Sequence, residues 1–480
     1  MNKRFIIEIM LLLAVVAGLW SCYDDKGNYD YKNLISLQID TLGIKAEQTA
    51  YQFENFNVPV EVKYAGDEKN LSYEWKIYPQ DPKKDDDVQK YDSAVVLYTK
   101  AVFDTIIYEV PGAYYLTLTV TDNVQDLKEY FTMKLNVETL VSRGLCVMDE
   151  KNGLYDLNII NITASEEQVY YHVYSGVNDT EVTNGKFLGR GTYSDNNVLY
   201  FFTENGGLKL DVNTYEIMSN DFTSWFSFPM SVTAAPEAYV ITSRPLEMIV
   251  TNGLVYVWDH RSMGVTTFGD RLDGDYKAAP YLPNISTSSF SSVIFDMKNK
   301  RFAPINQFGS NVGTFESTST GEFDLNDIGS TKELKFMENG FNSYTYAVFY
   351  DTETSGYSLY VMDFSGATAT PVKKYSMADC EGLTESSLYT FGNQGNVCFY
   401  ASGSDLYQYK YASTNKGAVV HSFSGETITG VEVFKNSGHA KDGKLLIVST
   451  ESGGEGKVYL IDFNELTGAI TGGTADPYTG

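Results

Sequence analysis

The chain has 480 residues and a formal net charge of −26, with 62 acidic residues against 36 lysines and arginines. So acidic a protein repels phosphate backbones and anionic lipid headgroups, which argues against nucleic-acid binding. Apart from Cys22, only Cys146, Cys380 and Cys398 occur, and three cysteines cannot form a disulfide framework. The length exceeds one typical domain.

The first 21 residues have the pattern of an export signal. Lys3 and Arg4 precede an unbroken apolar run over residues 9–19, which is too short to span a bilayer as a helix. Cys22 stands where cleavage would fall. We therefore expect residues 1–21 to be removed on export.

This segment resembles a bacterial lipoprotein signal peptide, whose cysteine thiol receives a diacylglycerol and becomes the new N-terminus. The resemblance implies lipid attachment at Cys22, followed by a polar tether over residues 22–33. Asp24 and Asp25 resemble the surface-export signal of Bacteroidetes lipoproteins. They imply an outer-membrane protein that faces the extracellular side. An ordinary secretory signal is the alternative.

Residues 34–138 are predicted to form a β-sandwich domain. Residues 71–77 alternate apolar and polar side chains and place Trp75 on the apolar face. A Pro-Gly turn opens the long alternating strand over 110–122, and residues 130–137 supply its hairpin partner. The pattern resembles the PKD-type immunoglobulin-like sandwich, which implies a spacer or interaction module without catalytic residues.

Residues 140–480 repeat a unit of about fifty residues. Each unit has an apolar strand, a turn rich in Gly, Asn, Asp or Ser, and a second strand with Leu or Tyr. The first strands begin at residues 145, 198, 248, 293, 347, 397 and 445. A period near fifty with several strands is typical of β-propeller blades. We predict an all-β chain with a seven-bladed propeller. Six or eight blades, a large irregular sandwich and a β-helix are the alternatives.

The sequence contains no recognisable catalytic motif. Its four histidines fall in different units without zinc-ligand spacing, and no nucleophile elbow, Walker loop or dinucleotide fingerprint occurs. We therefore predict a protein that is not an enzyme and has neither cofactor nor metal. The acidic runs at 85–87 and 270–275 are interpreted as solvated loop charge, and Cys146 and Cys398 as buried thiols. A carboxylate pair assembled in the propeller funnel would be the alternative.

Aromatic side chains are the other candidates for ligand binding. Trp225 lies in a predicted loop, and Tyr256 and Trp258 lie near a strand end. Their flat apolar faces with polar edges suit stacking on a sugar ring or gripping a peptide. We predict that they contact a glycan or peptide ligand. Packing in the protein core is the alternative.

The order of lipobox, acidic export signal, PKD-like domain and propeller is similar to the PKD-like lipoproteins of Bacteroidetes. Members of that family occur beside Sus-type transporter pairs, in which a TonB-dependent barrel has a lipoprotein lid. The resemblance implies a non-enzymatic accessory that captures nutrient or docks to the transporter. A surface glycan-degrading enzyme and a structural or adhesive lipoprotein are the alternatives.

Overall fold

The structure is a computed structural model that describes residues 35–80, 94–139, 144–162, 168–193, 196–228, 235–242, 245–285, 289–315, 321–474 and 476–479. Almost all regular structure in these residues is β-strand. The helical elements are α2 (Val173–Asn178) and the 3₁₀ turns η1 (Glu68–Asn70), η2 (Phe222–Trp225) and η4 (Phe341–Ser343). No helix in the described ranges is long and apolar enough to cross a membrane. The predicted all-β class is confirmed.

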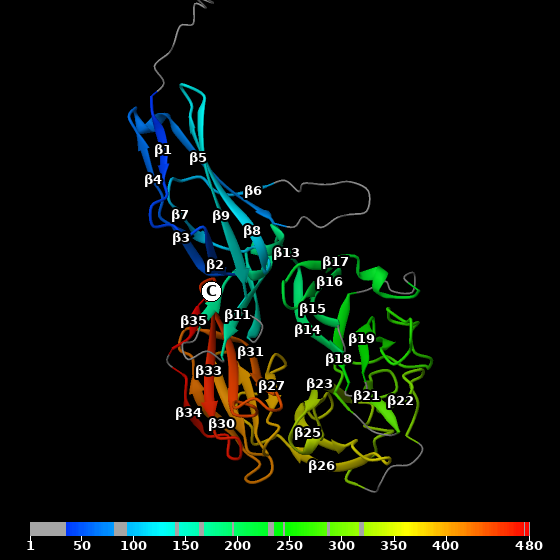
Figure 1. Cartoon of the computed structure of the whole chain (residues 1–480). Coiled ribbons are helices and arrows are strands. Elements are labelled where there is room, and N and C mark those ends of the chain that lie inside the picture. Colours follow the sequence, from blue (N-terminus) through cyan, green and yellow to red (C-terminus); the bar gives the residue numbers. More distant parts are fainter. Residues whose placement is uncertain are drawn as a thin grey trace, which may run out of the picture. The chain divides into compact units, whose positions relative to one another are not determined.

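The chain divides into two compact units, coloured along the sequence in Figure 1. Among the described residues, the first unit lies within 35–135. Two short segments inside that range, 49–56 and 106–113, belong instead to the second unit, together with 136–479.

Strands β1 to β9 form three antiparallel sheets that carry the sandwich. The two small sheets pair β1 (Leu37–Asp40) with β4 (Glu61–Tyr64), and β3 (Asn55–Val58) with β7 (Phe103–Ile106). The large sheet has the order β2 (Glu47–Tyr51), β9 (Leu127–Glu138), β8 (Gly112–Asp122), β5 (Leu71–Pro79) and β6 (Val95–Tyr98). Strands β8 and β9 are neighbours in this sheet, which confirms the predicted hairpin.

Trp75 lies in the sandwich core, as the alternation of β5 predicts. Its side chain is 0 % exposed, whereas Ser72 on the same strand faces solvent. The indole ring packs edge-on against Phe103 at 5.2 Å between ring centroids, and its N–H donates to the carbonyl of Lys100 at 3.0 Å. Because the buried N–H has a partner, the ring is buried without leaving a polar group unsatisfied.

Within its described residues, the second unit contains seven consecutive antiparallel sheets. The first three consist of β10 (Leu145–Lys151), β11 (Leu154–Asn161), β12 (Gln168–Tyr170) and β13 (Val182–Thr183); β14 (Gly185–Tyr193), β15 (Asn196–Thr203), β16 (Gly206–Asp211) and β17 (Ile217–Ser219); and β18 (Pro236–Ile241), β19 (Leu246–Thr251) and β20 (Leu254–Asp259). The fourth and fifth consist of β21 (Phe290–Asp296) and β22 (Arg301–Asn306); and β23 (Lys332–Asn339), β24 (Thr345–Asp351), β25 (Gly356–Asp363) and β26 (Thr370–Ser376). The last two consist of β27 (Leu388–Phe391), β28 (Cys398–Ser402), β29 (Asp405–Tyr409) and β30 (Gly417–Ser422); and β31 (Thr427–Val433), β32 (Leu445–Ser452), β33 (Glu455–Phe463), β34 (Ile470–Gly472) and β35 (Tyr478–Thr479).

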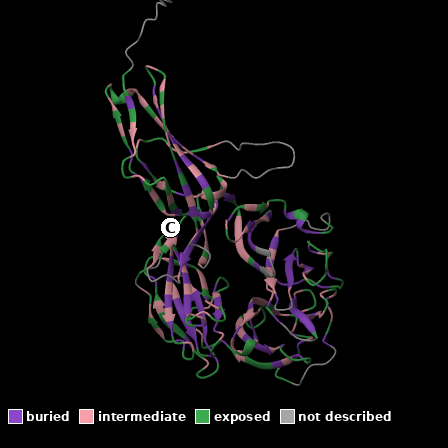
Figure 2. Cartoon of the chain, viewed as in Figure 1, coloured by how far each residue is buried: buried purple, intermediate pink, exposed green. Residues whose placement is uncertain are grey.

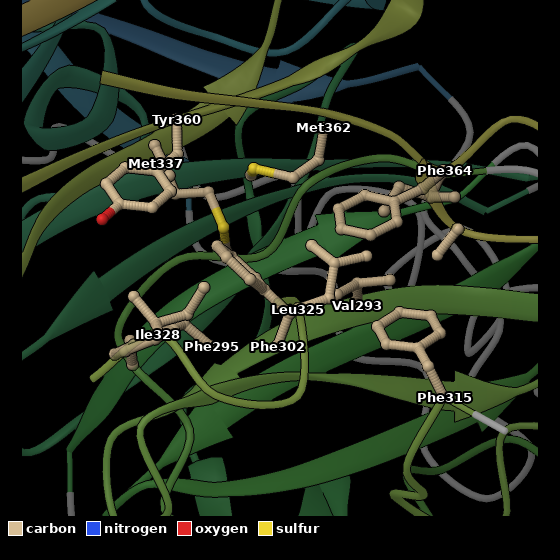
Figure 3. Close-up of a cluster of buried hydrophobic side chains, with 14 of the residues drawn as sticks. Val293, Phe295, Phe302, Phe315, Leu325, Ile328, Met337, Tyr360, Met362 and Phe364 are labelled. Atoms are coloured by element: carbon tan, nitrogen blue, oxygen red, sulfur yellow. The ribbon is translucent and has the colours of Figure 1, made fainter. Parts of the chain in front are cut away.

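Hydrophobic clusters join each sheet to the next. Buried residues are concentrated on the strands, as Figure 2 shows. Between the fourth and fifth sheets, Phe295 and Phe302 pack on Phe349 at 5.0 and 6.0 Å between ring centroids, and Figure 3 shows this cluster. Burying one such side chain stabilises the fold by about 1.5–3 kcal/mol. First strands of successive sheets also contact each other, for example β10 with β14 and β27 with β31. This is the arrangement of propeller blades, and the predicted seven-bladed propeller is confirmed.

In the first blade, the predicted hairpin occupies other strand positions than in the second blade. The expected hairpins are all present as antiparallel pairs. The first-blade hairpin, β10 and β11, consists of the first and second strands of its sheet. The second-blade hairpin, β15 and β16, consists of the second and third strands. Leu157 and Ile159 of β11 pack with Leu199 and Phe201 of β15, so β11 occupies the second-strand position. Hydrophobicity alone cannot distinguish a first strand from a second, because both are buried in a blade.

A cluster of aromatic rings around Phe53 connects the segments 49–56 and 106–113 to the propeller unit. Phe53 is buried, and its ring lies 6.0 Å from Tyr108, 6.0 Å from Tyr170 and 6.2 Å from Tyr215. Its backbone has φ of 66°, a left-handed conformation that a bulky residue rarely adopts. The aromatic packing offsets this local strain.

Candidate ligand-binding site

A cavity of about 410 Å³ lies between the first and seventh blades. Strands β10 and β11 form one wall, and strands β31, β32, β33 and β35 contribute to the other. Ligand pockets in proteins usually enclose about 300–1,000 Å³, so the volume suits a small molecule.

The alternation of side chains explains the first wall. Leu157 and Ile159 of β11 point toward the second blade, so Asn158 and Ile160 point the other way, into the cavity wall. The β10–β11 register places Val147 opposite Asn158 and Asp149 opposite Asp156. This face therefore mixes apolar and polar side chains.

The wall from the seventh blade follows the same rule. Leu446 and Val448 of β32 pack toward the sixth blade, and the cavity is lined by Ser449 and Glu451 of that strand. Val458 of β33 is the cross-strand partner of Ser449 and also lines the cavity. Tyr171 and Tyr478 line the cavity, but no aromatic side chain of strands β10, β11, β31, β32 or β33 does, so the space between these strands is not filled.

Asp149 has an incomplete set of hydrogen bonds. Its Oδ1 atom is shielded from solvent and has no hydrogen-bond partner within the described residues. Burial raises the pKa of Asp149, and the facing Asp156 carboxylate raises it further. A buried acceptor without a partner costs about 1–3 kcal/mol, so this oxygen would gain from a donor placed in the cavity.

Asp156, in contrast, is held by hydrogen bonds within the protein. It accepts from the backbone N–H of Leu157 at 2.8 Å, from the N–H of Ser175 at 3.1 Å, and from the Ser175 hydroxyl. Its Oδ2 lies 3.4 Å from His172 Nδ1, and the N–H of His172 donates to Asn158 at 2.9 Å. These contacts position helix α2, whereas Asp149 Oδ1, across the strand pair, has no partner among the described residues.

The charges on the opposite wall are mostly paired. Lys457 Nζ lies 2.7 Å from Glu426 Oε1, and Thr450 donates to the same carboxylate at 2.6 Å. The Lys457 ammonium holds the pKa of Glu426 below its usual value. Ser449 accepts from the Thr429 hydroxyl at 3.0 Å. A hydroxyl that accepts one hydrogen bond retains its own hydrogen for donation.

One hydrogen bond ties the two blades together beside the cavity. Strand β35 pairs with β33, and the Tyr171 hydroxyl of the first blade donates to the carbonyl of Thr479 at 2.7 Å. Tyr171, Tyr478 and Thr479 all line the cavity. Strand β35 thus belongs to the seventh blade and also contacts the first.

The structure places the three predicted aromatic contacts in the protein interior. Tyr256, Trp225 and Trp258 are only 1, 2 and 6 % exposed, and they pack between the second and third blades. The indole N–H groups donate internally, to Ser219 at 3.0 Å and to the carbonyl of Val265 at 3.0 Å. A sugar needs an exposed ring face for stacking, and these rings do not offer one. Core packing accounts for their positions.

These rings surround a lysine that the sequence did not single out. Lys209 Nζ lies 4.8 Å from the ring centroid of Trp225, 5.2 Å from that of Trp258 and 5.8 Å from that of Tyr200. Burial lowers the pKa of Lys209 to about 8, and the Glu247 carboxylate opposes the shift. The rings are therefore occupied by a cation of the protein itself.

Glu247 is the buried acid beside this cage. It is 1 % exposed, accepts from the Tyr200 hydroxyl at 2.6 Å and lies 2.8 Å from His260 Nε2. No sequence motif marks these residues, because they come from three strands or strand ends. A charged residue inside the otherwise apolar run 246–250 is a signal that could have indicated the cluster.

The other predicted site residues have varied positions. Cys22, Asp24, Asp25 and the acidic run 85–87 lie outside the described residues. The described part of the chain contains no group of three His, Cys, Asp or Glu side chains arranged to hold a metal. The prediction of buried thiols is confirmed for Cys398 and wrong for Cys146, which is exposed on strand β10. Cys146 is the cross-strand partner of Ile159 in β11, and desolvation by the surrounding protein still raises the pKa of its thiol to about 11.

Fold and cavity together define a class: an all-β protein with an N-terminal sandwich and a seven-bladed propeller that carries a cavity between its first and last blades. Residues 22–186 match the model of the PKD-like family. The match extends beyond the sandwich through β10 to β13 of the first blade.

Two further comparisons concern the whole chain. A search of curated proteins finds no match. Among solved structures, the chain is similar to a quinoprotein alcohol dehydrogenase-like protein from Bacteroides thetaiotaomicron VPI-5482, at 13 % identity and a TM-score of 0.47. The alignment covers 88 % of this chain and 92 % of that one. At this TM-score, the similarity carries no argument about ligand or reaction.

Proposed function

We propose that this protein is a lipid-anchored accessory of a Sus-type TonB-dependent uptake system, and that its propeller binds nutrient without converting it. The cavity between the first and seventh blades carries this proposal. Its size suits a small ligand, and the buried Asp149 oxygen has no hydrogen-bond donor among the residues that the structure describes. The lipoprotein-like N-terminus and the PKD-like match support placement at the cell surface.

Docking to the transporter is tested by co-purification. The full-length lipoprotein is purified from detergent-solubilised outer membranes, and bound proteins are identified by mass spectrometry. We expect a TonB-dependent barrel and its lid lipoprotein, and we expect both to be lost from a Cys22→Ala variant that cannot be lipidated. Absence of the barrel while the lipid is present on Cys22 would contradict the docking proposal.

Surface placement needs a separate test. Intact cells are treated with a protease that cannot cross the outer membrane, and the protein is detected by immunoblot. We expect degradation of the native protein and protection of a variant with Asp24→Ala and Asp25→Ala. Equal protection of both proteins would refute outward exposure.

A glycan-degrading enzyme is the second candidate, and one observation favours it. Asp149 and Asp156 are directly opposed across strands β10 and β11, and the pKa of Asp149 is raised. Two carboxyl groups with different environments are the usual means of acid–base catalysis in glycosidases. Incubation with a glycan panel, scored for new reducing ends, distinguishes the two functions. Turnover that is abolished by Asp149→Asn would replace binding with catalysis.

A further inference from the structure

We propose that the cavity between the first and seventh blades binds a single sugar ring without an acidic substituent, with the Asp149 carboxyl group accepting from a ring hydroxyl or amine. This inference rests on the ligand-capture part of the proposed function, and it names the class of ligand. It does not depend on docking to a transporter.

The volume of the cavity sets the size of the ligand. At about 410 Å³, it lies near the lower end of the usual range of about 300–1,000 Å³ for ligand pockets. A small cyclic molecule fits such a space, whereas an extended polymer or a folded peptide does not. Any polymer bound here would therefore be recognised by one terminal unit.

The wall chemistry calls for a ligand with both apolar and hydroxylated surface. Val147, Ile160 and Val458 contribute apolar surface, on which the C–H face of a sugar ring packs. Asp149 contributes an acceptor that has no partner in the described part of the chain, and Ser449 retains a donor hydrogen. A purely apolar ligand would leave the buried Asp149 oxygen unsatisfied.

The charge of the lining disfavours anionic ligands. Asp149, Glu150 and Glu451 line the cavity, while the ammonium of Lys457 is already paired with Glu426. Lys151 alone does not balance the three acids. A carboxylate-bearing sugar would be repelled by these acids, whereas a neutral or amino sugar would not.

Titration calorimetry on the full-length lipoprotein in detergent tests the inference. The probes are glucose, galactose, mannose and N-acetylglucosamine as neutral sugars, glucosamine as an amino sugar and glucuronate as an anionic sugar. We expect at least one neutral or amino sugar to bind, and glucuronate to bind at least tenfold more weakly. Absence of binding by all six sugars, or tightest binding of glucuronate, would overturn the proposal.

Variants of the cavity locate the binding. Asp149→Asn should weaken binding at least tenfold, and Asp270→Asn, at an exposed acid away from the cavity, should leave it unchanged. Val458→Trp should fill the cavity and abolish binding, with Val419→Trp on an exposed strand position as its control. Ser449→Val is a smaller change that serves if Val458→Trp fails to fold, as judged by circular dichroism. Unchanged binding in both Asp149→Asn and Val458→Trp would overturn the assignment. If Val458→Trp does not fold, unchanged binding in both Asp149→Asn and Ser449→Val would overturn it.

The same samples separate this inference from the proposed function. Co-purification of the barrel with a wild-type protein that binds no sugar would refute the sugar site alone. Sugar binding that is lost in Val458→Trp, with co-purification of the barrel retained, would support a capture site distinct from the docking surface.

Discussion

Lys209 is a charged side chain in an aromatic cage, and Lys209→Met tests whether desolvation or ring attraction dominates its energetics. The substitution keeps an unbranched side chain of similar length and removes the charge. Burial lowers the pKa of this lysine to about 8. The folded protein therefore holds the charged form less favourably than the unfolded chain does, and we expect the methionine variant to be more stable at pH 7.

The size of the effect follows from the two pKa values. Each pKa unit corresponds to about 1.4 kcal/mol, so the interval from about 8 to the ordinary 10.5 corresponds to about 3 kcal/mol. The side chain is partly exposed, and the rings at 4.8 to 5.8 Å attract its charge, so both effects reduce this value. We expect Lys209→Met to raise the free energy of unfolding by on the order of 1–2 kcal/mol at pH 7.

The pH dependence of stability tests again whether Lys209→Met is stabilising. Between pH 8 and 10 the unfolded chain binds a proton at this lysine that the folded chain does not, so stability of the native protein rises over this interval. The advantage of Lys209→Met should therefore shrink from pH 7 to pH 9.5. Urea unfolding followed by tryptophan fluorescence measures the free energy of unfolding of the native protein and of the variant at each pH. Lys410→Met, at an exposed position, is the control. A destabilised variant at pH 7, or a difference that does not change with pH, would show that ring attraction outweighs desolvation.

Three further predictions concern packing, thiol access and acid stability. Phe302→Ala should lower the free energy of unfolding by about 3–5 kcal/mol in urea titrations, because the ring is fully buried, and a loss below about 1 kcal/mol would contradict the cluster in Figure 3. Cys146 should react with a thiol reagent in the native protein, slowly because desolvation raises the pKa of its thiol to about 11, and Cys398 should react only after unfolding; equal rates would contradict their placement. Asp122 accepts from the Tyr64 hydroxyl, which helps to hold the pKa of Asp122 at about 2, so its stabilising contribution is lost as the pH falls from about 4 to 2. Asp122→Asn should therefore be less stable at pH 7 and less sensitive to acid by circular dichroism, and an unchanged acid transition would refute this.

The strands could be predicted because their alternation is local. In β5 the apolar face of Trp75 and Ile77 can be read directly from neighbouring residues, and the structure buries both. The blade hairpins were likewise visible as pairs of apolar runs around short turns. The position of β11 within the first blade could not be predicted, because it depends on the contact of β11 with β15 in another blade.

The cavity could not be predicted because its walls are distant in sequence. Asp149 and Val458 come together only when the ring closes, and no local pattern records that contact. A weaker signal exists in β11, where Asp156 and Asn158 alternate with Leu157 and Ile159 on a strand whose two faces are both covered. Polar residues at such positions indicate hydrogen bonding or a site, since an unpaired polar group would be costly to bury.

The aromatic residues show that residue type alone does not distinguish ligand binding from core packing. Trp225 and Trp258 have the chemistry of sugar-binding residues, but the same chemistry also suits a propeller core. Only their neighbours distinguish the two roles. Here the rings enclose Lys209, so their exposed area is small although they surround a charged group.

The location of the cavity follows from how the ring closes. Each interface between consecutive blades is covalently continuous and is filled by apolar clusters, as between the sixth and seventh blades. The first and seventh blades instead come from segments about three hundred residues apart, and their facing strands carry Asp149 and Ser449 where other interfaces have large apolar side chains. The hydrogen bond from Tyr171 to Thr479 links the two blades beside that space. A ligand bound there would contact both blades and would stabilise the closed ring in proportion to its affinity. Ligand capture and ring closure would then be thermodynamically coupled, so a sugar that binds the cavity should also raise the unfolding temperature of the propeller.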